Sequence, residues 1–451
     1  MKISETPQDL TRRNFLKGGS LATFMTLLGG VELVAQQEPK ADASPPAGQV
    51  KCAVIGCGVW GREIVTTLSR VSTAQVTAIC DPYPAYLKRA GRLAPDAKPV
   101  DDYKKILEDK DIPAVIIATP SHLHKPVALD ALQAGKHVYC EAPLATTLED
   151  AKAIAVAARD NPKVHFQAGL QLRSDPQRTF VLNFIRSGAW GKAVAARAQW
   201  HKKQSWRFSS PDADREKAIN WRLDQATSGG LISELGIHQL DVSSWYLGAR
   251  PTAVTGHGSI MLWKDGREVA DTVQALFEFP DGLRMQYDAT LANSFESDFE
   301  TFFGTDAAIV LRGQKAWMFK EVDAPALGWE VYAKKETFYK ETGIALMAGA
   351  SKQKNLTEDA AQEAVAPTPL QFALENFLRN AKDVGGAVED FTTNFGSDDP
   401  KALLEHLATV PRPAHAGYRE GYEATVIALK ANEAIQSGQR VELKQEWFEL
   451  A

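Results

Sequence analysis

The chain of 451 residues has few cysteines, no excess of basic charge and no long apolar segment beyond its N-terminal region. Its four cysteines, Cys52, Cys57, Cys80 and Cys140, lack the spacing of metal ligands such as C-x-x-C, and a disulfide framework is not expected at this length. We therefore expect buried thiols and no metal site. The formal net charge of -5 argues against a nucleic-acid partner, because phosphate binding calls for a basic field.

The N-terminal segment has the features of an export signal. Arg12 and Arg13 precede an interrupted apolar stretch, Leu21 to Ala35, that is shorter than the roughly 20 residues needed to span a bilayer. An A-x-A pattern and the linker-like "SPPAG" follow it. We predict a twin-arginine (Tat) signal peptide over 1–43, a linker over 44–49, and a periplasmic or otherwise exported mature protein without a membrane span. The alternative is a disordered tail that happens to hold two arginines.

The stretch "VKCAVIGCGVWGREIVTTLSRV" predicts a dinucleotide-binding turn. An apolar run from Val50 to Ile55 is typical of a buried parallel strand, and a helical pattern follows from Trp60 to about Leu68. The glycines between them permit a tight turn, a close approach of pyrophosphate to the backbone, and helix–strand packing. The alternative is a structural glycine turn. The predicted cofactor contacts here are Gly56, Gly58, Val59, Trp60 and Gly61.

Asp81 ends a second predicted strand, twenty residues after Gly61. Its carboxylate can accept hydrogen bonds from both adenosine ribose hydroxyls and would repel a 2′-phosphate, so we predict NAD rather than NADP. Strands and helices then alternate to about residue 170, which indicates a doubly wound parallel sheet with its ligand at the carboxyl ends of the strands. The further predicted cofactor contacts at these ends are Thr119, Pro120, Ser121, His124, Glu141 and Gln171.

The glycine motif, "ATPSHLHKP", "GKHVYCEAP" and "GGLISELGIHQLD", in this order, resemble the Gfo/Idh/MocA family of oxidoreductases. The resemblance runs from about Val50 to at least Gly282. It implies an α/β chain with a Rossmann domain over 50–170 and a C-terminal α+β domain over 171–451, whose open, mainly antiparallel sheet often serves oligomerisation. We therefore expect a homo-oligomer that uses NAD on sugars, polyols or related carbonyls. Residues 347–369 are polar and alanine-rich, and we expect an exposed insertion there.

One motif departs from the family. Many members carry Glu-Lys-Pro after the fourth strand, with the lysine near the nicotinamide, whereas this chain has Glu141, Ala142 and Pro143. Loss of an ammonium group would remove an acid–base contribution of about 100- to 10,000-fold. Either another group supplies the proton path, or the chemistry differs.

A helix predicted from about Leu231 to Tyr246 places Glu234, His238 and Asp241 on one face. The resemblance maps His238 onto a catalytic histidine and Glu234 onto a position where an aspartate is frequent. We predict that His238, oriented by Glu234, takes a proton from a hydroxyl as hydride leaves its carbon. The alternative is a histidine satisfied within a helix-to-sheet contact.

Substrate contacts are predicted in "ARAQWHKKQSWRFS", where tryptophan and cationic side chains follow a strand and suit a sugar. The alternative is a solvated basic turn. Lys202 or Lys203 could replace the missing ammonium group. Asp241 could instead hold His238 or a neighbouring loop. The candidates are Lys202, Trp206 and Arg207 from this stretch, Arg173 by family position, and Asp241.

Free NAD is expected to be scarce outside the cytoplasm, so an exported enzyme would have to regenerate a trapped cofactor in every cycle. We predict an oxidoreductase of a sugar, polyol or glycoside with tightly bound, recycled NAD, carried out folded by the Tat translocase. Two alternatives stay open. One is a glycoside hydrolase or lyase that works by transient oxidation and elimination, as in NAD-dependent glycosidases that also lack the lysine. The other is a non-catalytic, cofactor-bound sugar-binding relative.

Overall fold

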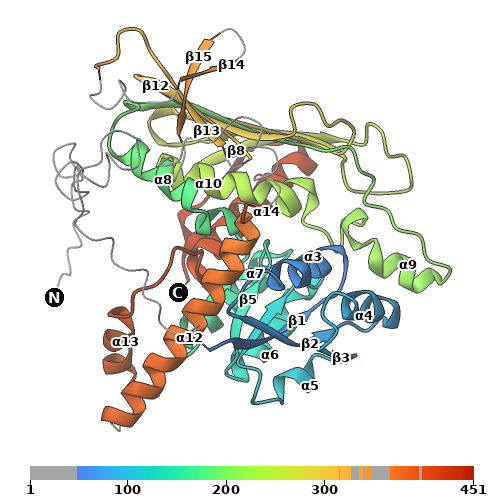
Figure 1. Ribbon diagram of the computed structural model, residues 1–451. Helices are drawn as coiled ribbons and strands as arrows, with labels where there is room; N and C mark the ends of the chain where they lie inside the picture. The colour runs from blue at the N-terminus through green and yellow to red at the C-terminus, as the bar shows by residue number, and fades with distance from the viewer. Residues whose placement is uncertain are drawn as a thin grey trace.

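The computed structural model describes residues 48–313, 315–326, 335–338, 341–346, 366–395 and 399–450. The predicted signal peptide over 1–43, most of the linker over 44–49 and most of the predicted insertion over 347–369 lie outside the described residues. Two sheets, with helices between them, form the layers visible in Figure 1.

The first sheet consists of six parallel strands in the order β3-β2-β1-β4-β5-β6. Its central strands β1 and β4 are apolar and buried except for the half-buried Lys51 of β1, as expected where helices cover both faces. This confirms the predicted doubly wound α/β architecture. The strands are β1 (Val50–Ile55), β2 (Ala74–Cys80), β3 (Lys98–Val100), β4 (Ala114–Ile117), β5 (His137–Cys140) and β6 (Phe166–Ala168); the helices are α3 (Val59–Leu68), α4 (Pro84–Gly91), α5 (Lys104–Leu107), α6 (His124–Gln133) and α7 (Leu148–Arg159).

All four cysteines are free and buried in or beside this sheet, as predicted. Burial raises the pKa of Cys52, Cys57 and Cys80 to about 12, so these thiols stay protonated at neutral pH. They therefore act as small apolar side chains of the core.

The second sheet has ten strands in the order β14-β15-β13-β12-β11-β7-β10-β9-β8-β16. Only β7 and β10 pair in parallel; the other neighbours in this order are antiparallel, which confirms a mainly antiparallel sheet. The strands are β7 (Ala193–His201), β8 (Ala253–Ser259), β9 (Thr272–Glu278), β10 (Arg284–Thr290), β11 (Asp298–Gly304), β12 (Ala307–Arg312), β13 (Lys315–Lys320), β14 (Lys335–Phe338), β15 (Glu341–Leu346) and β16 (Val441–Glu442).

Three helices, α8 (Pro176–Arg186), α10 (Ile237–Leu247) and α14 (Tyr418–Ser437), lie between the two sheets (Figure 1). In α14, Gly421 packs directly against Ala168 of β6, which holds the two domains together. A buried ion pair of 2.8 Å joins Arg178 of α8 to Glu300 of β11. The site between the layers is thus built on rigid elements.

The helix α12 (Pro369–Phe395) packs on the first sheet, although the sequence prediction places it in the second domain. Its residues Leu370, Leu374 and Phe377 are buried in one cluster with residues of β1 and α3. The apolar stripe of α12 thus packs against residues that are more than 300 positions away in the sequence. The short helices α9 (Ala213–Ile219) and α13 (Pro400–Ala408) complete the set of described α-helices. None of the helices described is both long enough and apolar enough to cross a bilayer.

Candidate functional site

The loop between β1 and α3 presents open backbone at the carboxyl edge of the first sheet. Gly56 has a φ of +99°, and a Cβ there would lie 2.5 Å from the Ala118 carbonyl oxygen. A Cβ at Gly61 would overlap the Gly56 carbonyl. Gly58, in contrast, starts α3 with no side-chain cap and with open space where its Cβ would be. This cradle fits a pyrophosphate on the free amides of the helix.

The first turn of α3 is also open on its outer side. Val59 is 60% and Trp60 38% exposed, which is unusual for large apolar residues next to a buried strand. Both side chains border the surface that the glycines leave free. Their predicted contact with a cofactor stays a prediction.

Asp81 is buried at the end of β2 and braces the glycine loop. Its Oδ2 accepts a hydrogen bond of 2.9 Å from the Cys57 amide, and its Oδ1 one of 2.8 Å from the Tyr83 amide. Burial raises the pKa of Asp81, while these two amides and the charges of Arg215 and Arg62 oppose that shift. The carboxylate is thus fixed where the adenosine ribose of a dinucleotide is expected.

His124 supports two loops of this edge. It is buried, and its Nδ1 and Nε2 each lie 3.0 Å from a carbonyl oxygen, that of Pro143 and that of Thr119 respectively. Burial lowers the pKa of His124 to about 4, so the ring is neutral and donates to one of the two carbonyls at a time. His124, a predicted cofactor contact, therefore positions the loops that carry Pro143 and Thr119.

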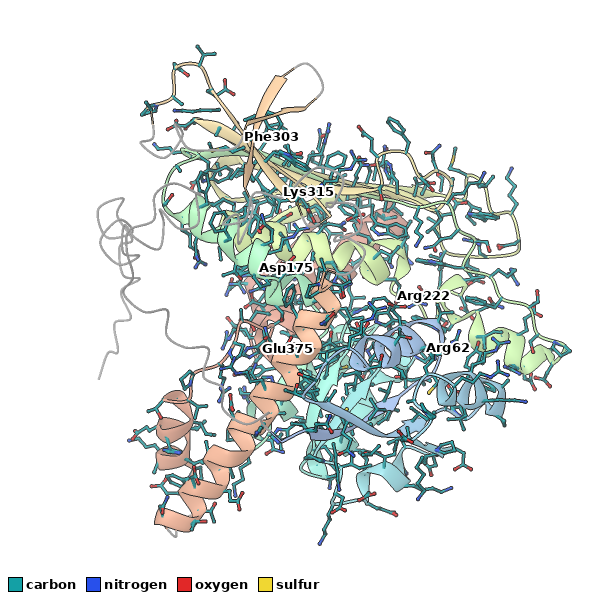
Figure 2. All side chains as sticks on the ribbon, viewed as in Figure 1. Arg62, Asp175, Arg222, Phe303, Lys315 and Glu375 are labelled. Atoms are coloured by element: carbon teal, nitrogen blue, oxygen red, sulfur yellow. The ribbon has the colours of Figure 1, made fainter. Side chains whose placement is uncertain are left out.

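A polar contact joins the two domains at the same edge. The Ser121 hydroxyl donates to Glu234 Oε2 over 3.2 Å, and Arg222 Nε donates to the same oxygen over 3.3 Å. Glu234 is buried, and burial raises its pKa while Arg222 opposes the shift. Figure 2 shows Arg222 between the two layers, on the same side of the molecule as Arg62.

Two tryptophans hold the Arg222 guanidinium. Its central carbon lies 4.4 Å from the ring centroid of Trp221 and 5.7 Å from that of Trp206. Trp206 has a φ of +62°, a left-handed conformation that costs a bulky residue about 1–3 kcal/mol. Such strain persists only where the surroundings impose it, which marks this loop as a candidate functional segment.

The helix predicted from Leu231 to Tyr246 contains an irregularity. A π-helical turn, Ile232–Gly236, precedes α10, and Gly236 in it is packed against the Tyr287 ring, which a Cβ would approach to 2.9 Å. Because a π turn follows an i→i+5 pattern, the regular α-helix begins only at Ile237, and Glu234 lies in the turn before it. Glu234 bonds Ser121 and Arg222, whereas Asp241 bonds Arg173. That these two acids and His238 share one face stays a prediction.

His238 carries an unpaired nitrogen. Its Nδ1 is buried without a hydrogen-bond partner, and burial lowers the pKa of the imidazole to about 4. The ring is thus neutral at neutral pH and able to accept a proton. Buried polar atoms without a partner are uncommon in native proteins, and a bound ligand or an ordered water is one way to satisfy them. The same state is found for Thr119 Oγ1, His122 Nδ1, Glu141 Oε1, Gln171 Oε1 and Glu234 Oε1.

The loop after β5 brings a second titratable group to this edge. Glu141 is buried, and burial raises its pKa to about 7. Gly169 is packed on it, since a Cβ there would lie 2.5 Å from Glu141 Oε2. The next peptide bond, Ala142–Pro143, is cis. A carboxyl with this pKa can give or take a proton near pH 7.

The predicted substrate residues divide into separate groups. Arg173 and Asp241 pair with each other at 2.8 Å, and Arg173 stacks on Trp245. The Arg207 side chain is paired with Asp265 and Glu216. Lys202 is exposed at the end of β7, and Trp206 lies beside Arg222. Their contacts with a substrate stay predictions.

Sequence reasoning missed two residues of this site, Trp221 and Arg222. The His122 ring lies 5.8 Å from that of Trp221, a contact between the two domains. The sequence offers no periodicity or spacing that joins residues of one domain to those of the other. Only tertiary structure shows them together.

Two sequence models of one family match this chain. "Oxidoreductase family, NAD-binding Rossmann fold" matches residues 50–169, and "GFO/IDH/MocA C-terminal domain" matches residues 181–317, together more than half of the chain. Levoglucosan dehydrogenase of Pseudarthrobacter phenanthrenivorans is 29% identical over 237 residues, which are 48% of this chain and 59% of that protein. The match thus spans about three fifths of this relative's length.

Two further relatives differ in their described activity. scyllo-Inositol 2-dehydrogenase (NAD(+)) of Bacillus subtilis is 29% identical over 270 residues, 58% of this chain and 74% of that protein. A glycosyl hydrolase family 109 protein of Shewanella baltica is 28% identical over 234 residues, 48% and 50% of the two chains. Among solved structures, levoglucosan dehydrogenase in complex with NADH and levoglucosan has a TM-score of 0.64 at 21% identity, covering 88% of this chain and all of that one, which supports the fold.

Proposed function

Because this chain belongs to the Gfo/Idh/MocA family of NAD-binding oxidoreductases, we propose that it is an exported enzyme that acts on a sugar, polyol or glycoside with a retained, recycled NAD. One observation carries the proposal. The contact of Ser121 with Glu234 brings the segment with the unpaired, neutral His238 to the carboxyl edge of the dinucleotide-binding sheet. Export by the Tat translocase is supported by Arg12 and Arg13 ahead of the apolar run. The open second sheet supports a homo-oligomer.

In the proposed reaction, different residues of the site take up the proton and stabilise the negative charge. When bound, NAD supplies the hydride acceptor at this edge. His238, neutral because burial lowers its pKa to about 4, takes the proton from the reacting hydroxyl. Glu234 accepts hydrogen bonds from Arg222 and Ser121 and thereby links the two domains.

Arg222 is the cation that takes over from the absent lysine. Ala142 carries no charge, whereas Arg222 donates to Glu234 Oε2 over 3.3 Å, and its positive charge opposes the rise in the pKa of both Glu141 and Glu234. An arginine side chain does not give up its proton in proteins. Arg222 therefore stabilises negative charge on the substrate oxygen, and the proton itself goes to His238.

A second candidate function is hydrolysis or elimination of a glycoside through transient oxidation. Two observations favour it: Ala142 in place of the lysine, and the glycosyl hydrolase family 109 protein among the relatives. Both reactions begin with removal of the same proton and hydride. They differ in whether a leaving group departs before the hydride returns.

The test is purification of the full chain by its native export route, mass spectrometry of the retained nucleotide, and product analysis on a panel of sugars, polyols and glycosides. A keto-sugar formed together with a reduced partner sugar supports the oxidoreductase. A cleaved glycoside with no net oxidation supports the second candidate. Binding of sugars without turnover of any panel member contradicts both.

A further inference from the structure

Helix α9 belongs by sequence to the second domain but lies beside α4 of the first (Figure 1). The contact is made by Arg215, whose guanidinium carbon lies 4.9 Å from the ring centroid of Tyr83 and 5.4 Å from that of Tyr86. The two tyrosine rings meet edge to face, with centroids 5.9 Å apart. α9 is thus a connection between the domains, separate from that of Ser121 and Glu234.

The position of this contact is set by Asp81. Tyr83 follows Asp81 by two residues and donates its amide to that carboxylate, and the charge of Arg215 lowers the pKa of Asp81. Arg62 of α3 completes the group, 5.5 Å from the Tyr86 ring and bonded to the Cys57 carbonyl. The surroundings of the predicted ribose site therefore comprise two guanidinium groups and two aromatic rings.

Arg215 has an unused donor at this place. Its Nε is buried without a hydrogen-bond partner, whereas its guanidinium already lies over the tyrosines. A buried N–H without an acceptor is costly in a native structure. Ribose hydroxyls and adenine nitrogens are acceptors of the kind that would satisfy it.

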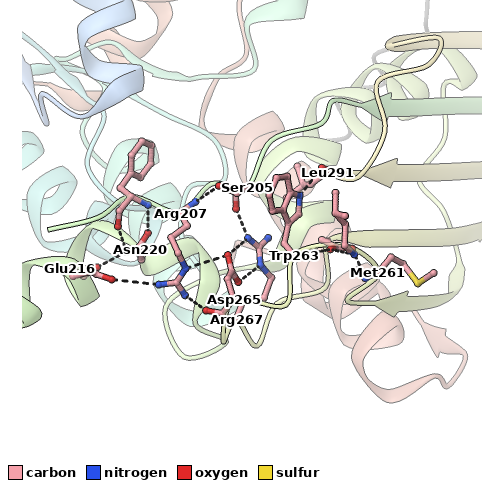
Figure 3. Close-up of polar contacts among 12 residues, drawn as sticks. Ser205, Arg207, Glu216, Asn220, Met261, Trp263, Asp265, Arg267 and Leu291 are labelled. Atoms are coloured by element: carbon pink, nitrogen blue, oxygen red, sulfur yellow. Dashed lines mark hydrogen bonds and ion pairs between the residues drawn. The ribbon is translucent and has the colours of Figure 1, made fainter.

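The base of α9 is tied firmly to the second domain (Figure 3). Asn220 accepts from the Phe208 amide and donates to the Phe208 carbonyl, each over 2.8 Å, and so closes the loop that carries α9. Arg207 joins Glu216 of α9 to Asp265. Arg267 holds Asp265 in turn, over 2.7 Å. Lifting α9 would therefore break several polar contacts.

We propose that α9 is a clamp over the adenosine end of bound NAD, with Arg215 as the residue that contacts the nucleoside. The inference rests on the proposed function, in which NAD is retained, and it assigns that retention to α9. A nucleotide can leave only after Arg215 has moved away from Tyr83 and Tyr86. The clamp thus slows dissociation and leaves the reacting end of the site unchanged.

The test compares NAD release from wild type, Arg215→Ala, Arg215→Gln and the control Lys217→Ala, an exposed residue of the same helix. Each purified full-length protein is loaded with NAD, and the dissociation rate is measured by dilution into excess etheno-NAD. We expect release about 10- to 100-fold faster in both Arg215 variants, the value of a hydrogen bond from a charged donor, and wild-type release in Lys217→Ala. Circular dichroism checks that the fold is kept.

Equal release rates in wild type and both Arg215 variants would overturn the clamp while leaving the proposed function intact. An effect confined to NADP would also overturn it, because Arg215 would then serve a 2′-phosphate. A wild-type protein with no affinity for NAD would contradict the proposed function itself. The two failures are therefore distinguishable.

Discussion

At the scale of single residues, the candidate site contains a neutral base and a cation held in place. Burial keeps the His238 imidazole uncharged, with Nδ1 free of partners. Arg222 is held by Glu234 and by the faces of Trp221 and Trp206. This separation lets proton transfer and charge stabilisation occur on different side chains, where a lysine could have supplied both.

Replacement of His238 by alanine should lower kcat about 100- to 10,000-fold, the usual contribution of a general base, while NAD stays bound. Because burial lowers the pKa of His238 to about 4, the base is lost only as pH falls toward that value. The acid limb of the wild-type kcat/KM profile should therefore lie near pH 4. Steady-state kinetics with the exposed control His257→Ala measure both effects. An unchanged kcat, or an acid limb at the ordinary value of 6.5, would rule out the assigned role.

Arg222→Ala should lower kcat about 100- to 1000-fold, as loss of a group that stabilises developing charge does. Arg222→Lys, which keeps the positive charge without the planar fork, should recover part of this loss. Arg250→Ala serves as the control, since Arg250 pairs with Glu423 in another part of the molecule. Full activity in Arg222→Ala would show that the missing ammonium has some other replacement or none.

At the scale of elements, two glycines of the β1–α3 turn have different roles: Gly58 leaves room for a ligand, and Gly61 allows close packing. Gly58→Ala adds a methyl group into open space, so the fold should persist while affinity for NAD falls about tenfold or more. Gly61→Ala overlaps the Gly56 carbonyl and should destabilise the whole domain. NAD titration and thermal unfolding, with Gly48→Ala as control, separate these effects. The account fails here if Gly58→Ala binds NAD as tightly as wild type.

The same element shows what local sequence can predict. The apolar run of β1, the glycines and Asp81 at the end of β2 all follow from short-range patterns, and the structure places them as expected. The π-helical turn over Ile232–Gly236 could not be foreseen, because it accompanies packing of Gly236 against the distant Tyr287. Local periodicity assigns a regular helix there.

Contacts between the domains could not be predicted from the sequence either. Ser121 and Glu234 are 113 residues apart, and no local sequence pattern indicates their hydrogen bond. The apolar stripe of α12 indicates a buried helix but does not say which sheet it covers. Arg222 and Arg215 have functional positions only because each reaches into this interface.

At the scale of the whole molecule, buried histidines link stability to pH. His137, His165 and His415 lie close together near α12, and burial lowers the pKa of all three, that of His137 to about 4. They are neutral when folded, whereas the unfolded chain takes up protons below about pH 6.5. The free energy of unfolding should therefore fall as pH drops from 6.5 toward 4.

His137→Asn should reduce this pH dependence. The asparagine side chain can still accept the hydrogen bond from the His165 backbone amide, but it does not titrate. The slope of unfolding free energy against pH, from denaturant titrations between pH 6.5 and 4, should be smaller than in wild type. The exposed control His257→Asn should keep the wild-type slope. Identical slopes in all three proteins would contradict the linkage.

The most direct test of the central claim is the near-ultraviolet absorbance of the nucleotide that the purified protein retains, followed while sugars and polyols are added without free NAD. The account predicts that at least one compound reduces the bound nucleotide, and that a carbonyl sugar then reoxidises it with no nucleotide released. A fully loaded protein whose absorbance never changes across the panel would contradict the claim that hydride is transferred at this site.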